Sequence, residues 1–296
     1  IILGMPTIGE ETVWTEISID GMGLRNFQKG PDTMNVTRVF KLDVQAIDQI
    51  IKRGINSSSH SFVLSLPTPD GKYKRFKFFD SNTMSPSLAR KYPMIRAFSG
   101  RSLDDDAVSV QVELTSKGLS GQVLRAGNRW MLEPLEEPFK DRVAVYYARD
   151  AKPRADSFRC SVSDAQERRK IVQKKNKARN MSQKTLNVAP QARSRGEQLR
   201  IYRLAVATTG EYGAFHGGTK EQALSAVVKT INRINGIFNR ELSVGFELIG
   251  DNDLIIFTDP DLDPFHGNND TNLLIDESQS VITENIGSSN FDLGHT

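Results

Sequence analysis

The sequence contains a single cysteine, Cys160, among its 296 residues. One thiol can form neither a disulfide within the chain nor a zinc site built from several cysteines. Long apolar runs are also missing, and runs such as residues 254–257 are far too short to span a bilayer. The balance of 38% hydrophobic and 25% charged residues excludes a collagen-like or wholly disordered chain. At about 150 residues per domain, this length predicts two domains.

Histidines are few and scattered. None of the four, His60, His216, His266 and His295, lies four residues from another, so no helix presents a two-histidine metal face. The sequence also lacks a Gly-x-Ser-x-Gly elbow, a phosphate-binding loop and a dinucleotide fingerprint that opens a helix. Motifs alone therefore predict no catalytic residue within these 296 positions.

The net charge of +3 is a cancellation between unlike segments. Residues 1–165 hold 23 basic and 20 acidic residues, residues 166–200 hold 11 and 2, and residues 201–296 hold 5 and 14. The basic segment, rich in Gln, Asn and Ser, has too few large apolar residues to form a core. We predict a flexible linker at 164–198. A solvated tether is favoured over a nucleic-acid arm, because neither aromatic residues nor a reading helix accompany the charge.

The first segment is predicted to be rich in β-structure. Short apolar or alternating runs recur with turn residues between them, including Pro69-Asp70-Gly71 and Ser99-Gly100. The runs that we interpret as strands are 36–42, 62–66, 73–79, 108–114, 121–124, 130–132 and 143–147. Helical spacing predicts one helix over 43–52. This spacing of strands is typical of an antiparallel sandwich or a barrel-like domain.

The last segment alternates strands and helices. Strands are predicted at 199–208, 242–249 and 254–257, with a final one that begins near Asp292. Thr219 and Gln222 form a capping-box pattern ahead of an amphipathic helix of about 20 residues, and 270–286 is a second helix. This order indicates an α/β layer structure, so the whole chain is of the α+β class.

Two local features invite a metal-binding interpretation. Residues 259–263 hold three aspartates, but as a calcium loop they would place Pro264 at the sixth position, where glycine is needed, and Asp270 at the twelfth, where glutamate is needed. A turn is the better explanation of these aspartates. Calcium remains an alternative cofactor that no motif in the sequence supports. Cys160 is either a buried small hydrophobe or, beside Arg154, Arg159 and Arg168, a thiolate able to bind a metal held by the next domain.

The last segment resembles the bacterial reprolysin-like zinc metalloproteases, which are metzincins of the M12B type. The resemblance runs in order through LAVATTGEY (204–212), FHGGT (215–219), INRINGIF (231–238), LIIFTDP (254–260) and NFDLGH (290–295). Residues 1–165 are similar, more loosely, to the β-rich propeptides of these secreted enzymes. The resemblance implies a propeptide at 1–163, an activation linker at 164–198 and the N-terminal part of a catalytic domain at 199–296.

In that family, three histidines of H-E-x-x-H-x-x-G-x-x-H hold zinc, and the glutamate acts as general base. This motif is absent, so the resemblance implies that it follows Thr296 and that the chain alone is inactive. Cys160 becomes a candidate cysteine-switch ligand of zinc. Lys184, Arg193 and Arg195 become candidate cleavage sites for a trypsin-like activating protease. Asp292, Leu293, Gly294 and His295 would begin the strand that pairs with a peptide or protein substrate, and His295 has no catalytic role.

The first residues, Ile1-Ile2-Leu3, include neither an initiator methionine nor a basic region. We therefore expect a processed, secreted protein whose signal peptide has been removed. Two other function classes compete with the protease precursor. One is a non-enzymatic secreted binding or adhesion module with a β-sandwich. The other is a nucleic-acid-binding protein that uses the basic segment. Of the possible partners, we expect neither a nucleic acid nor, through a membrane-spanning segment, a lipid bilayer.

Overall fold

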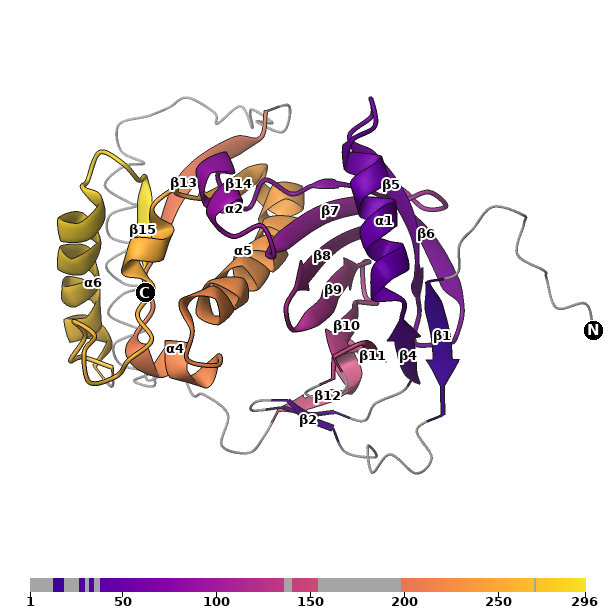
Figure 1. Cartoon of the computed structure of the whole chain (residues 1–296), viewed down its shortest axis with the longest axis horizontal. Helices are drawn as coiled ribbons and strands as arrows, with labels where there is room; N and C mark the ends of the chain where they lie inside the picture. Colours follow the sequence, from indigo (N-terminus) through magenta and orange to yellow (C-terminus); the bar gives the residue numbers. More distant parts are fainter. Residues whose placement is uncertain are drawn as a thin grey trace, which may run out of the picture.

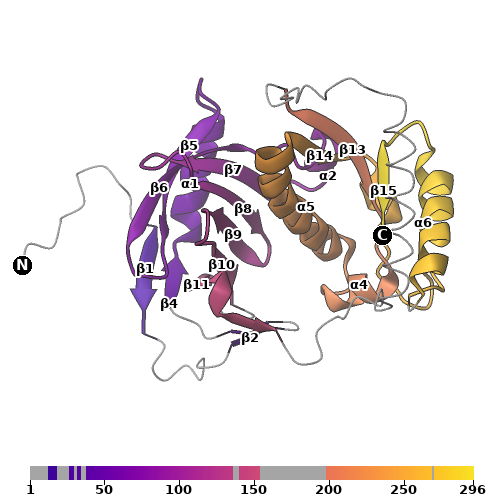
Figure 2. The ribbon, with the colours of Figure 1, turned by 180° about the vertical axis from the view of Figure 1, so that it is seen from behind.

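A computed structural model describes residues 13–18, 27–29, 32–34, 38–135, 140–153, 198–268 and 270–296. These residues form two parts that lie side by side (Figures 1 and 2). We call residues 13–153 the N-terminal part, which is dominated by antiparallel strands, and residues 198–296 the C-terminal part, which combines parallel strands with helices. The chain is therefore of the α+β class, as its sequence predicts.

The N-terminal part is built on one large curled sheet. Its nine strands follow the order β1-β4-β11-β10-β9-β8-β7-β6-β5, and each neighbouring pair is antiparallel. Their bounds are β1 (Trp14–Ile17), β4 (Arg38–Leu42), β5 (Ser61–Pro67), β6 (Tyr73–Asp80), β7 (Arg96–Ser102), β8 (Ser109–Thr115), β9 (Gly118–Leu124), β10 (Trp130–Pro134) and β11 (Arg142–Tyr147). The two edge strands approach each other, since Trp14 Nε1 of β1 donates to the carbonyl oxygen of Ser65 in β5 at 2.7 Å. The domain is thus barrel-like, and not a sandwich of two sheets.

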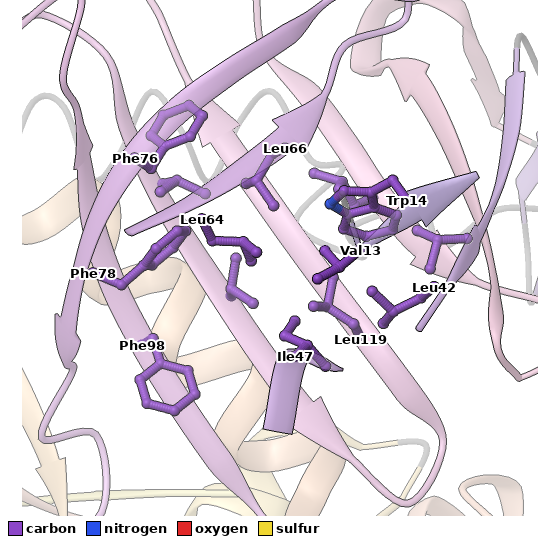
Figure 3. Packing of buried hydrophobic residues seen from close by; sticks show 14 of the residues in the cluster. Val13, Trp14, Leu42, Ile47, Leu64, Leu66, Phe76, Phe78, Phe98 and Leu119 are labelled. Atoms are coloured by element: carbon purple, nitrogen blue, oxygen red, sulfur yellow. The ribbon is translucent and has the colours of Figure 1, made fainter. Parts of the chain in front are cut away.

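Helix α1 (Val44–Ile55) covers the interior of this curled sheet. Asp43 caps its first turn by accepting from the amides of Gln45 and Ala46, as favoured at an N-cap. Ile47 and Ile51 of the helix are 1% exposed and belong to the main hydrophobic cluster. In Figure 3, Ile47 and the sheet residues Phe76, Phe78 and Phe98 surround the same interior. Burial of alternate strand residues against one helix explains why the apolar alternation in the sequence predicts these strands.

Each of the seven strands predicted for the first segment overlaps an observed strand, and the predicted helix is α1. The turn at Ser99-Gly100 is wrong, because both residues lie inside β7. Gly100 is needed there for packing: a Cβ atom at this position would meet Phe78 Cδ1 at 2.8 Å. Strands β1 and β7 of the large sheet were not predicted, nor were helix α2 (Pro86–Lys91) and 3₁₀-helix η2 (Ala148–Asp150). A second small sheet was also missed, and it consists of β2 (Phe27–Lys29), β3 (Asp32–Met34) and β12 (Ala151–Pro153).

The C-terminal part is a three-layer α/β structure. Its parallel strands β13 (Arg200–Val206), β14 (Val244–Leu248) and β15 (Leu293–His295) follow the order β14-β13-β15. Leu204 and Val206 of β13 pack with helix α5 (Lys220–Leu242), whereas Ala205 and Ala207 pack with helix α6 (Thr271–Ile286). Figures 1 and 2 show the two helices on opposite faces of the sheet. A strand buried on both faces is typical of parallel α/β sheets.

Most of the elements predicted for the last segment are confirmed. Thr219 caps α5 by accepting from the amide of Gln222 at 3.2 Å, which is half of the predicted capping box. The strand at 254–257 is wrong: residues 252–255 form a 3₁₀-helix, η3 (Asn252–Ile255), and only Ile256 makes an isolated bridge, to Thr208. The physical reason is Asn252, whose fully buried amide bonds both the N–H (2.8 Å) and the C=O (3.0 Å) of Val206. This side chain takes the place that a neighbouring strand would have.

Candidate active-site region and the contact between the two parts

A cavity of about 260 Å³ lies at the carboxyl end of β13. Its walls come from the end of β13, from α4 (Gly210–Phe215), from α5 and from the end of β15, and they are mainly apolar. The polar side chains on the walls are Thr208, Thr209, Tyr212, Thr230, His295 and Thr296. In open α/β sheets, ligands bind outside the carboxyl ends of the strands, so this end of the sheet is the candidate functional region of the C-terminal part.

Tyr212 is the most perturbed ionisable group at this cavity. Burial raises the pKa of its hydroxyl to about 12, so the phenol stays neutral at physiological pH. Its ring lies 4.3 Å from the ring of His216, and Phe215 packs on the same imidazole. These contacts pack His216, the C-cap of α4, against Tyr212, which lines the cavity.

The predicted substrate-binding residues lie at one edge of the small sheet. Leu293, Gly294 and His295 form β15, pair with residues 204–206 of β13 and are exposed. Asp292 fixes the start of β15, because its carboxylate accepts from the backbone amide and from the guanidinium of Arg203, each at 2.8 Å. Hydrogen bonds from Arg203 lower the pKa of Asp292. Within the described ranges no further strand pairs with β15, which leaves its outer edge open to an added strand.

The described residues contain no group of three or more His, Cys, Asp or Glu side chains that could hold a metal ion. His60 Nδ1 lies 2.8 Å from the carbonyl oxygen of Ile55, and His266 lies beside Glu277, with 3.6 Å between ring and carboxylate. His216 and His295 lie near α4 and on β15. A zinc site of the metzincin kind therefore does not fit the residues that the structure describes. Cys160, Lys184, Arg193 and Arg195 lie outside the described residues.

The acidic loop at 259–263 is a turn, as its composition predicts. Asp259 Oδ1 accepts from the amide of Asp261 at 2.9 Å, and its carbonyl oxygen accepts from the amide of Asp263 at 3.1 Å. Asp263 in turn accepts from the amides of Phe265 and Gly210, which ties the loop to the start of α4. The hydrogen bonds of Asp259 and Asp263 thus account for the acidic composition of this loop.

A buried polar cluster joins the two parts of the chain. Glu113 of β8 is fully buried and accepts from Asn232 Nδ2 of α5 at 2.7 Å and from Ser120 Oγ at 2.8 Å. Asn232, also fully buried, accepts from Thr83 Oγ1 at 3.2 Å. Burial, opposed by the charge of Arg233, raises the pKa of Glu113. A carboxyl group in this position is held by donors from both parts.

Glu133 of β10 completes the cluster with two ion pairs. Its carboxylate accepts from Lys229 Nζ at 2.6 Å and from an Arg233 amino group at 2.7 Å, and it is 4% exposed. Although burial alone would lower it, Glu133 and Glu113 raise the pKa of Arg233. Motif analysis missed these residues, because alternating polar positions such as Gln111 and Glu113 indicate a solvent-facing strand surface. The only signal in the sequence is the pair of asparagines, Asn232 and Asn235, on the apolar side of a predicted helix.

The C-terminal part thus has the architecture of an α/β layer with a cavity at the carboxyl end of its central strand. Residues 198–296 match the family described as Metallo-peptidase family M12B Reprolysin-like. The match covers the C-terminal third of the chain, and the family that this segment is similar to depends on zinc in general. No curated protein matches the chain. None of the described helices is both long enough and apolar enough to cross a membrane.

Proposed function

We propose that this chain is the propeptide, the activation linker and the N-terminal part of the catalytic domain of a secreted zinc metalloendopeptidase zymogen. The observation that carries the proposal is the family match, which begins at residue 198, two residues before β13 opens the parallel sheet. The curled sheet of residues 13–153 lies wholly before this match and takes the role of the propeptide. The basic segment at 164–198 connects the two and takes the role of the activation linker.

The proposal divides the chemistry between this chain and residues beyond it. In this proposal the zinc ligands and the general base belong to an H-E-x-x-H-x-x-G-x-x-H motif, which the 296 residues do not contain and which the family resemblance places after this segment. These 296 residues are inactive as a peptidase on their own. Their contribution to substrate binding is the open edge of β15, at Leu293, Gly294 and His295, where a peptide would add as a further strand.

Two steps control the proposed enzyme. Cys160 supplies the thiolate that occupies a zinc position and keeps the precursor latent. A trypsin-like protease then cuts the basic segment, with Lys184, Arg193 and Arg195 as the candidate sites. An extracellular location for the proposed enzyme agrees with the reprolysin family, whose members are typically extracellular.

The test is Cys160→Ala in the full-length precursor, with peptidase activity and zinc content measured before any cut in residues 164–198. We expect premature activity in the variant and latency in the parent. Ser161→Ala, one residue away, is the matched control and should stay latent. Unchanged latency of a zinc-loaded Cys160→Ala protein would refute the cysteine switch, and a full-length precursor that binds no zinc would refute the peptidase assignment.

A further inference from the structure

Helix α5 of the C-terminal part lies across the outer face of the curled sheet, over β7 and β8 (Figure 2). On β8 that face alternates with the hydrophobic interior, so its residues there, Gln111 and Glu113, are polar, as is Glu133 of β10. They are nonetheless buried: Gln111 is 5%, Glu113 0% and Glu133 4% exposed. A sheet face that is both polar and covered needs a partner with complementary polar groups, because unpaired buried polar groups are costly.

Helix α5 supplies that complement. Two carboxyl groups on the sheet, Glu113 and Glu133, meet two cations on the helix, Lys229 and Arg233. Asn232, between the two cations in sequence, bonds Glu113 and Thr83 of the N-terminal part. At this point of the contact the sheet contributes carboxyl groups and the helix contributes cations, so the two faces are electrostatically complementary.

Gly236 sets the distance between the helix and the sheet. A Cβ atom at this position would meet Gln111 Cγ at 2.6 Å and Gln111 Nε2 at 2.9 Å. Helix interiors disfavour glycine by about 1 kcal/mol relative to alanine. The glycine is therefore explained by close approach to the N-terminal part, and not by the needs of α5 itself.

The N-terminal part also covers one edge of the parallel sheet. Met84 forms a parallel bridge with Leu248 of β14. The amide of Ser85 donates to the carbonyl oxygen of Leu248 at 2.9 Å, and the amide of Leu248 donates to the carbonyl oxygen of Thr83 at 2.8 Å. Lys91 adds ion pairs to Asp251 and Asp253 at 3.0 and 2.9 Å. The β15 edge, on the other side of β13, is not part of this contact.

We propose that helix α5 and the β14 edge form a docking surface for the N-terminal part, and that this part stays bound there as a separate polypeptide after the chain is cut within residues 154–197. The contact is stabilised by buried ion pairs, hydrogen bonds and apolar packing of Leu88 and Ile95 with α5, none of which requires the connecting segment. A cut alone therefore does not expose α5.

This inference rests on the proposed function only for its regulatory meaning, in which activation requires both cleavage and a later separation of the two parts. The docking itself is tested without peptidase activity. A specific protease site is introduced into the full chain between residues 164 and 198, the protein is cut, and a dilution series is run on size-exclusion chromatography at about 0.15 M salt. We expect both fragments to elute together.

Gly236→Leu places a side chain against Gln111, whereas Glu241→Leu puts the same side chain at an exposed position of the same helix. Overpacking of this kind should raise the dissociation constant of the two fragments about 10- to 100-fold. Glu241→Leu should leave this constant as in the parent. Circular dichroism of both uncut variants checks that they are folded. A second matched pair of variants, at Ser85, tests the same surface in case Gly236→Leu does not fold.

Ser85→Pro removes the amide that bonds Leu248, at a backbone φ of −58° that proline accepts, and Ser85→Ala keeps that amide. The first should dissociate about fivefold more readily than the second. Elution of the parent fragments as two separate species would overturn the proposal. Equal dissociation within each matched pair would overturn the assignment of the surface. A precursor without peptidase activity whose cut fragments stay together would refute the function and leave the docking intact.

Discussion

Replacing Asn232 by leucine tests whether the buried cluster holds the two parts together. The side chain is fully buried, and leucine has the same number of side-chain heavy atoms with the same branching at Cγ, so the change removes the polar contacts and adds only the bulk of two methyl groups. It deletes the hydrogen bonds to Glu113 (2.7 Å) and from Thr83 (3.2 Å), and a longer one to the carbonyl oxygen of Val112 (3.4 Å). At about 1 kcal/mol per bond, the free energy of unfolding should fall by about 3 kcal/mol.

A double-mutant cycle with Glu113→Leu separates this coupling from unrelated damage. Each single variant leaves a buried polar partner unsatisfied, whereas the double variant replaces both by apolar side chains, which is far less destabilising. Urea unfolding of the four proteins should therefore give a coupling of at least about 1 kcal/mol, with the double variant more stable than the two single losses predict. Asn235→Leu is the control on the same helix, since Asn235 bonds Phe246 within the C-terminal part and should be additive with Glu113→Leu. Additivity of the Asn232 and Glu113 changes to within about 0.5 kcal/mol would refute the reasoning.

Three further outcomes are expected. Asp43→Ala removes the cap of α1 and should cost about 1 kcal/mol of unfolding free energy in urea, while an unchanged midpoint would contradict the capping role. Burial raises the pKa of Glu113 above its ordinary 4.5. The stabilisation that Glu113 contributes is therefore complete below pH 4.5 and is lost as the pH rises through the raised pKa. Glu113→Gln should flatten the profile of unfolding free energy from pH 4.5 upward, and identical profiles for the parent and the variant would contradict a raised pKa. Limited trypsin should cut first within 168–195, and early cuts inside 1–150 would contradict the proposed division of the chain.

The sequence predicts the elements of this fold well where one apolar pattern decides the structure. The alternation at 108–114 and the helical spacing from 224 to 238 each give one apolar face, and both elements occur as predicted. The prediction failed at residues 254–257, where an apolar run suits a strand but the amide of Asn252 already bonds Val206. A single side chain that replaces a strand leaves no periodic signal.

The contact between the two parts was not predictable for a different reason. Gln111 and Glu113 have the pattern of residues that face water, and only the three-dimensional position of α5 shows that they are covered. Long-range pairs such as Glu113 with Asn232 are 119 residues apart, and no local rule relates them. The expectation that residues 292–295 bind substrate came only from the resemblance to a family and stays a prediction, and the described residues contain no His, Cys, Asp or Glu cluster that could hold a metal ion.

The closure of the curled sheet between β1 and β5 has a consequence for how this domain opens. Among the described residues no backbone ladder joins these two strands. The side chain of Trp14 bonds Ser65 across the gap, and the side chains of Arg38 in β4 and Tyr147 in β11 bond Pro69 and Asp70 in the turn that follows β5. Side-chain bridges break one at a time, whereas a ladder breaks cooperatively. Amide hydrogens that face this seam should therefore exchange with solvent sooner than those between β8 and β9, and a force applied to the start of β1 should peel that strand away before the rest of the sheet yields.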